Sequence, residues 1–242
     1  MLRHIGTKRS FLHNIRLAVL LSLNAGFINA AGFLAFAVLT TNVTGHAALL
    51  AVSIANDKWR AARMVALWLF LFLAGAFTSA SYIRKAGADK PYAYSVPIIG
   101  IILVLLFVII FGNNYDGSLV KTEYFAGSLL FAMGMQNALV SIISGSVVRT
   151  THLTGMFTDL GIDLSAALFK SGHSDNSLKR RIVLRLSIIM CFLLGGLIGG
   201  FLFVHYKYHA FLIPISLLLL ALVYDYFRVR FTHAIRHKFL SN

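Results

Sequence analysis

Long apolar runs separated by short polar segments make up most of this chain. Six runs are long enough to cross a bilayer as helices, because about 20 apolar residues span the roughly 30 Å hydrocarbon core. They cover residues 15–39, 62–83, 93–111, 122–147, 182–204 and 209–227. Apolar and polar residues do not alternate within them, which favours helices over strands. The pattern predicts an all-α integral membrane protein with six transmembrane helices in a single membrane domain, residues 1–242.

Two further apolar segments, 45–56 and 155–169, are too short to cross. As helices they would reach only about 18–22 Å. Each follows nearly the same polar phrase, TTNVTGH at 40–46 and TTHLTGM at 150–156. Thr and Asn are good N-caps, and Gly allows close backbone approach. We therefore expect two short broken, re-entrant or interfacial helices that begin at these phrases.

The two phrases sit at equivalent places in two halves of the chain. INAAG at 28–32 precedes the first phrase as QNALV at 136–140 precedes the second, and segment 63–76 resembles 185–198. This predicts two internal repeats of three spans, about 15–111 and about 122–227. The repeats are inverted if the short helices do not cross, and parallel if they do. Either arrangement puts 17 of the 22 Lys and Arg residues on one side, so helix length alone favours inverted repeats.

Composition supports the membrane assignment. Hydrophobic residues make up 58% of the chain and charged residues 12%, whereas a soluble domain carries about 25% charged residues. A lipid bilayer is therefore the expected partner. The net charge of +14 would suggest nucleic acid on a soluble protein, but Lys and Arg here occupy loops and tails. We expect no nucleic-acid partner, an uncleaved first span, and basic tails at 1–14 and 228–242 on the cytoplasmic side.

Paired broken segments in two halves of a membrane protein indicate a transporter's binding site. Amide side chains lie just upstream of each phrase, and two carboxylates four positions apart share one face of the second short helix. The residues expected to line a substrate or ion site are Asn29, Thr44, Gly45, His46, Gln136, Asn137, Thr154, Gly155, Asp159 and Asp163.

Asp159 and Asp163 could serve a proton- or cation-coupled step, because ionisable groups at membrane depth usually face a cavity, a partner or an ion path. His46 is one candidate partner. Alternatively, the helix is interfacial and both carboxylates face water. The chain contains no HExxH, Cys pair, GxSxG or phosphate-binding glycine loop, so we expect no metal, no cofactor and no enzyme activity.

Glycine spacing predicts close helix packing in LLGGLIGGF, residues 193–201. Its two overlapping GxxxG pairs, Gly195/Gly199 and Gly196/Gly200, let helix backbones approach each other in lipid. We expect this contact within the protomer, and a homo-oligomer stays open as an alternative.

The phrases and their flanking segments resemble the YoaK family of small bacterial multi-pass membrane proteins from about residue 15 to 227. The family motifs match Gly26, Asn29 and Ala30, then Thr44 and Gly45, then Gly134, Gln136 and Asn137, then Thr154 and Gly155. Many members carry Asp where this chain has Asn29 and Asn where it has His46, and this departure weakens any proposal of a carboxylate in the first span. It implies a bacterial cytoplasmic (inner) membrane location and supplies no substrate.

These observations lead to one expected function and two alternatives. We expect a small secondary transporter or permease for an unknown small solute or ion, with its site between the repeats. A channel or facilitator with paired half-helices is the first alternative. A structural or regulatory membrane protein without transport is the second.

Overall fold

The computed structural model describes residues 10–87, 90, 92–169 and 176–224, and its regular secondary structure is entirely helical. The helices are α1 (Phe11–Phe36), α2 (Val43–Ala55), α3 (Trp59–Ala86), α4 (Ser95–Phe111), α5 (Leu119–Ser144), α6 (Leu153–Phe169) and α7 (Asn176–Tyr206). Two 3-10 turns, Gly112–Asn114 and Lys207–Phe211, follow α4 and α7. The second turn leads into a helix over 212–224.

The described residues include five helical stretches long and apolar enough to cross a membrane. They are α1, α3, Ser95–Asn114, α5 and the stretch Asn176–Tyr224. The last one contains the predicted span 182–204 and the described part, 209–224, of the predicted span 209–227, and the turn Lys207–Phe211 interrupts it. The prediction of an all-α, multi-pass membrane protein is therefore confirmed.

Most of the helices α1–α7 begin earlier than the apolar pattern indicated, and α4, which begins at Ser95 rather than 93, is the exception. α1 begins at Phe11 rather than 15, because the Ser10 side chain accepts a hydrogen bond from the His13 backbone N–H and the His13 ring bonds back to Ser10. Residues 10–14 are thus not part of a basic tail. The rest of that predicted tail, 1–9, and the other one, 228–242, lie outside the described residues. α2 and α6 also begin early, so Gly45 and Gly155 lie in the first helical turn.

Two close helix pairs form the core. α1 packs along α7, and α5 packs along α3. Gly26 of α1 lies against the Phe192 carbonyl of α7, and Gly134 of α5 lies against the Phe72 carbonyl of α3. Because lipid supplies no hydrophobic drive between helices, such contacts depend on small residues that let backbones meet.

The predicted role of the glycine pairs is confirmed inside the chain. Gly195 packs on Leu23 of α1, and Gly199 packs on Phe27 one turn further on. Gly196 also faces α1, whereas Gly200 meets only the Leu34 side chain at 3.8 Å.

Polarity is arranged with polar groups inside and apolar groups outside. Ser22, Asn24 and Gln136 are fully buried between helices. Large apolar side chains cover the outer faces instead, and both Phe77 of α3 and Leu197 of α7 are 71% exposed. A surface of this kind is stable only where lipid, not water, surrounds it.

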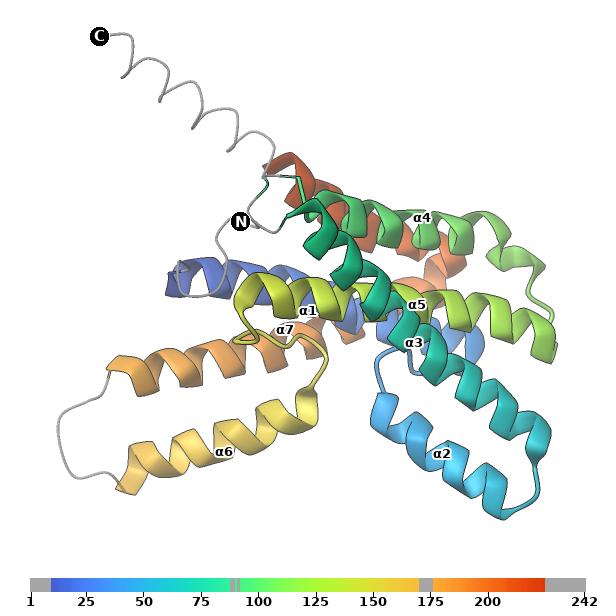
Figure 1. Ribbon diagram of the computed structural model, residues 1–242, viewed down its shortest axis with the longest axis horizontal. Coiled ribbons are helices and arrows are strands. Elements are labelled where there is room, and N and C mark those ends of the chain that lie inside the picture. The colour runs from blue at the N-terminus through green and yellow to red at the C-terminus, as the bar shows by residue number, and fades with distance from the viewer. Residues whose placement is uncertain (1–9, 88–89, 91, 170–175, 225–242) are drawn as a thin grey trace, which may run out of the picture.

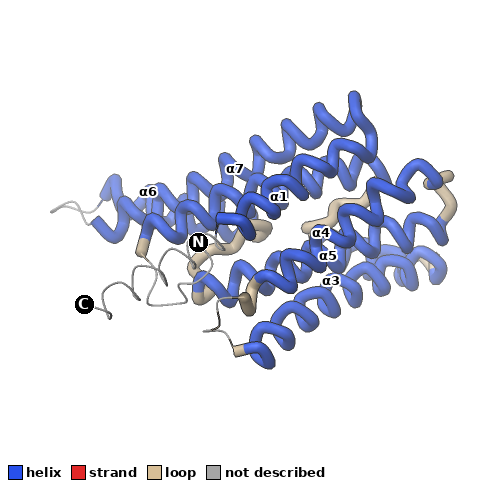
Figure 2. The backbone as a smooth tube through the Cα atoms, turned by 90° about the horizontal axis from the view of Figure 1, so that it is seen from above, coloured by secondary structure: helices blue, strands red, loops and turns tan. Residues whose placement is uncertain are grey.

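The short helices occupy corresponding places at the two ends of the molecule (Figure 1). Both begin near its middle and run outward, α2 to pair with α3 and α6 to pair with α7. Seen from above, α6, α7 and α1 lie on one side, and α3 and α5 lie on the other (Figure 2). The middle of the molecule, where α1 meets α5, is thus flanked by both helix breaks.

We predict that Gly26→Ala lowers the free energy of unfolding by about 1–3 kcal/mol, because the new methyl group would overlap the Phe192 carbonyl. The thermal midpoint in detergent should fall by roughly 2–12 °C. Gly200→Ala is the matched control, because its methyl group has room and Ala favours a helix by about 1 kcal/mol. Equal midpoints for the two variants would contradict the proposed α1–α7 contact.

Candidate functional site

An amide bridge joins the two halves of the chain at the centre of the fold. The Asn24 side chain of α1 donates to Gln136 Oε1 of α5 at 2.7 Å. Gln136 Nε2 in turn donates to the Leu21 carbonyl at 2.9 Å. Both side chains are fully buried, and Asn24 Oδ1 has no partner. The site thus contains a polar atom that is available to a further group.

Each break is tied back to the long helix that precedes it. Asn29 of α1 accepts a hydrogen bond from the Thr41 backbone N–H at 3.1 Å. Asn137 of α5 accepts one from the Thr151 hydroxyl at 2.8 Å. The two predicted amides therefore have the same role in both halves, which is to hold the extended residues that precede a short helix.

The hydroxyl groups of Thr40 and Thr150 differ from the other Thr side chains of the two phrases. Both residues are fully buried, and neither hydroxyl has a hydrogen-bond partner. Burying a hydroxyl without a partner costs about 1–3 kcal/mol. By contrast, the predicted site residues Thr44 and Thr154 are exposed on the short helices. The sequence therefore identified the phrases, but the buried hydroxyls are those of their first Thr residues.

His46 anchors α2 to α3. It is the buried residue of α2, and its ring lies 5.4 Å from the Trp68 ring, centroid to centroid. Neither His46 Nδ1 nor Trp68 Nε1 has a hydrogen-bond partner. The suggested partnership of His46 with the carboxylates is not found, because Asp159 and Asp163 pair with arginines instead.

Two carboxylates and two guanidinium groups join α6 to α7. The Asp163 side chain is 6% exposed and pairs with Arg185 and, at 3.3 Å, with Arg181. Arg185 also contacts the Asp159 carboxylate at 3.3 Å and donates to the Asp159 carbonyl at 2.9 Å. Asp159 is partly exposed and also paired with Arg185. Its environment therefore lies between the two alternatives considered above, a carboxylate that faces a partner and one that faces water. Both negative charges are compensated, which is what a buried carboxylate requires.

The structure brings some of the predicted residues together and separates others. Asn29 and Asn137 lie at their breaks, and Gln136 lies at the centre. Asp159 and Asp163 belong to the α6–α7 contact. The site residues expected from the sequence did not include several buried polar residues: Ser22, Asn24, Thr40, Trp68, Ser79 and Thr150. They also did not include the partly exposed Arg181 and Arg185.

A family model described as protein of unknown function (DUF1275) matches residues 17–224. The chain belongs to this family. The match covers both helix breaks, the amide bridge and the α6–α7 ion pairs, so the whole site lies within the family's own domain. Among curated proteins and among solved structures, nothing matches the chain closely enough to show a relationship.

We predict that Asn24 and Gln136 are energetically coupled. Asn24→Leu and Gln136→Leu should each cost about 1–3 kcal/mol of unfolding free energy, because each leaves a buried polar group unpaired. The double variant should cost less than the sum by about 0.5–3 kcal/mol. Unfolding in detergent measures all three values, and additive effects would contradict the bridge.

We also predict unequal roles for the two carboxylates of α6. Asp163→Asn should cost about 1–3 kcal/mol of unfolding free energy, because the buried end of the α6–α7 contact loses its charge, while Arg185 keeps Asp159 and Arg181 is half exposed. Asp159→Asn should cost less than about 1 kcal/mol, since that side chain is 44% exposed and its carbonyl bond to Arg185 survives. Thermal unfolding of the two variants compares them directly, and the reverse order would contradict the arrangement.

Proposed function

We propose that this protein is a small secondary transporter of the bacterial cytoplasmic membrane, with its solute site at the two helix breaks. The observation that carries the proposal is the pair of buried, unpartnered hydroxyls of Thr40 and Thr150. Each one lies three positions before a short helix that begins near the middle of the fold (Figure 1). Hydroxyls left unpaired in both halves are what a site awaiting a polar solute would present.

Inverted repeats are part of this proposal, and the two halves support it in detail. α1 and α5 both have 26 residues, follow a Ser cap, and end at a left-handed residue, Ala37 or Gly145. The helix contacts also correspond, because α1 packs on α7 as α5 packs on α3. Gly195 meets Leu23 as Gly75 meets Phe131. Because Gly75 corresponds to Gly195 in these contacts, segment 63–76 of the first half corresponds to 183–196 of the second half rather than to 185–198.

The second part of the proposal is that the two short helices, α2 and α6, are re-entrant. α2 runs back to the end of the molecule where α1 finishes, and α6 runs back to the end where α5 finishes (Figure 1). Neither short helix would then cross the membrane. With the helix over 212–224 counted as a sixth span, both chain termini lie on the cytoplasmic side, as the excess of Lys and Arg on that side requires.

Alternating access would use the close helix pairs as rigid units. The α1–α7 pair and the α3–α5 pair are each held by backbone contact at glycine, whereas α1 and α5 meet through an amide bridge that water or solute can replace. We propose that the pairs rock against each other at this bridge. The Asp–Arg contact would keep α6 on α7 during the motion, and protonation of its carboxylates would provide coupling.

We predict that Thr40→Val together with Thr150→Val lowers solute uptake at least about tenfold without lowering stability. Val has nearly the same shape as Thr and removes hydroxyls that make no hydrogen bond, so the free energy of unfolding should stay equal or rise. Uptake is measured in proteoliposomes with an entrapped pH indicator, against a panel of amino acids, sugars, nucleobases and organic acids. Thr158→Val is the matched control, because that hydroxyl is exposed and bonds its own helix.

Different outcomes separate the alternatives. Saturable, gradient-dependent uptake that the double substitution abolishes supports a transporter. Fast flux that does not saturate with solute concentration indicates a channel or facilitator. Folded wild-type protein that moves no solute in the panel, or a double variant with full uptake, would count against the proposed site.

A further inference from the structure

A cavity of about 790 Å³ lies where the α2–α3 turn meets the start of α5. Its lining consists of Asp57, Lys58, Trp59, Arg60, Ala61, Arg63, Met64, Leu119, Val120 and Glu123. The turn is well fixed, since the Lys58 backbone N–H donates to the Ser53 carbonyl at 2.8 Å. The cavity therefore has a frame of ordered backbone, contributed by both halves of the chain.

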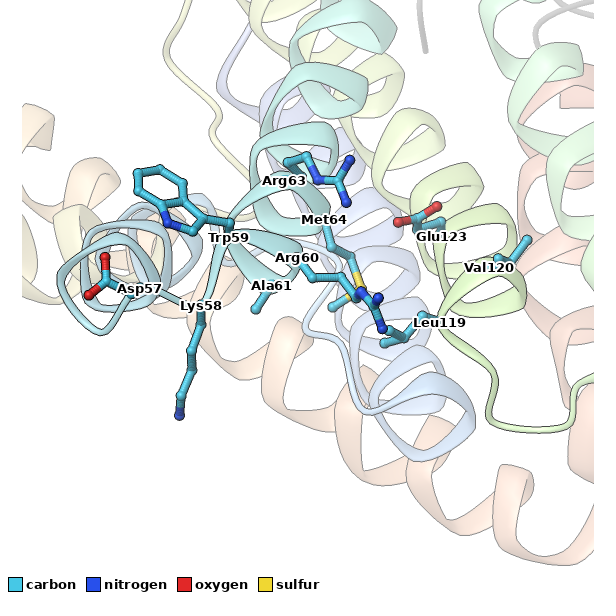
Figure 3. Close-up of a pocket in the computed structure, with 10 residues that line it drawn as sticks. All are labelled: Asp57, Lys58, Trp59, Arg60, Ala61, Arg63, Met64, Leu119, Val120 and Glu123. Atoms are coloured by element: carbon cyan, nitrogen blue, oxygen red, sulfur yellow. The ribbon is translucent and has the colours of Figure 1, made fainter.

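The charged side chains of this cavity form no ion pairs among the described residues. Among the described acidic residues, Asp116, Asp159 and Asp163 all form ion pairs. Within the same part of the chain, Glu123, Arg60 and Arg63 form none. Figure 3 shows the Arg63 guanidinium and the Glu123 carboxylate directed toward each other from α3 and α5. Charges of both signs thus gather around one space without neutralising each other.

The cavity lies at a membrane surface. α3 and α5 are both long enough to cross, and the cavity is lined by their first residues. Trp59 is 60% exposed there, in the position where Trp anchors a helix at the lipid–water boundary. Leu119 and Val120 are exposed on the α5 side of the cavity, opposite Trp59 (Figure 3), and provide an apolar wall toward the bilayer.

We propose that this cavity binds the headgroup of a phospholipid that carries a phosphate and a primary ammonium group, as phosphatidylethanolamine does. Arg60 and Arg63 hold the phosphate, because guanidinium groups bind phosphate oxygens through paired hydrogen bonds. Glu123 accepts hydrogen bonds from the ammonium group. Leu119, Val120 and Met64 contact the first part of the acyl chains.

The lining distinguishes this lipid from its common alternatives. A choline headgroup has no N–H to donate to Glu123 and is usually recognised by a cage of several aromatic rings, whereas Trp59 is the one aromatic side chain in the lining. An anionic glycerol headgroup offers Glu123 neutral hydroxyls in place of an ammonium group, so the negative charge of that carboxylate would stay uncompensated by the lipid. Ammonium and phosphate in one molecule match both signs of the cavity.

The proposal is tested by native mass spectrometry of the purified full chain, titrated with phosphatidylethanolamine, phosphatidylcholine and phosphatidylglycerol of equal acyl composition. We expect the ethanolamine lipid to bind at least about tenfold more tightly than the other two. Glu123→Gln should reduce this preference to less than about threefold. Arg60→Gln with Arg63→Gln should weaken binding of the ethanolamine lipid at least about tenfold.

Lys121→Gln is the matched control at the same end of the molecule. Lys121 contacts Asp116 at 2.8 Å, and hydrogen bonds from Lys121 and then Ser118 hold the pKa of that carboxyl well below its usual range. The Lys121→Gln substitution should leave lipid binding unchanged. Circular dichroism checks that every variant is folded. Equal binding of the three lipids by the wild type, or an unchanged preference in Glu123→Gln, would overturn the proposal. So would glycerophosphoethanolamine binding as tightly as the intact lipid, because the ligand would then be a soluble headgroup.

Discussion

Backbone contact at glycine is the constraint on which the rest of this structure depends. In lipid, apolar side chains gain little by leaving the solvent for a neighbouring helix, so association needs close packing and polar contacts. Gly26 and Gly134 bring α1 onto α7 and α5 onto α3 so closely that no Cβ fits. Two tight pairs result, and their contact with each other is of another kind. It combines apolar side chains, such as Phe36 stacked on Phe125, with a short chain of amide hydrogen bonds through Asn24 and Gln136.

This difference between the contacts suggests how stability and motion can coexist. A glycine contact depends on shape and has one best geometry, whereas hydrogen bonds between amides can be replaced by bonds to water or solute. The centre of the fold also contains buried polar atoms without partners, at Asn24, Thr40 and Thr150. A protein that only needed stability would have little use for them, because each costs free energy.

Charged side chains are paired in one part of the molecule and unpaired in another. Asp163 is buried and fully compensated by Arg181 and Arg185, so it serves the α6–α7 contact. Glu123 and Arg63 lie near the starts of two helices long enough to cross a membrane, and neither forms an ion pair among the described residues. The pairing of Asp163 with arginines favours a structural role that also allows coupling. The unpaired charges of Glu123 and Arg63 favour the binding of an external ligand. Burial and pairing, more than residue type, separate these two cases.

The sequence by itself determined the membrane class, the places of the long helices and the two breaks. Length of apolar run decides whether a helix can span, and Thr, Asn and Gly at a break have local roles that need no knowledge of distant residues. Asn29 and Asn137 could be selected for the same reason, since each lies shortly before its break.

Only the tertiary structure decided which polar side chains are buried and which charges are paired. Thr40 and Thr44 are four positions apart in one phrase, yet one is fully buried and the other exposed. Asp163 finds its partners on another helix, and the lining of the surface cavity joins residues from both halves of the chain. Such outcomes depend on which helices pack together, and in this protein the close approach at glycine sets that choice.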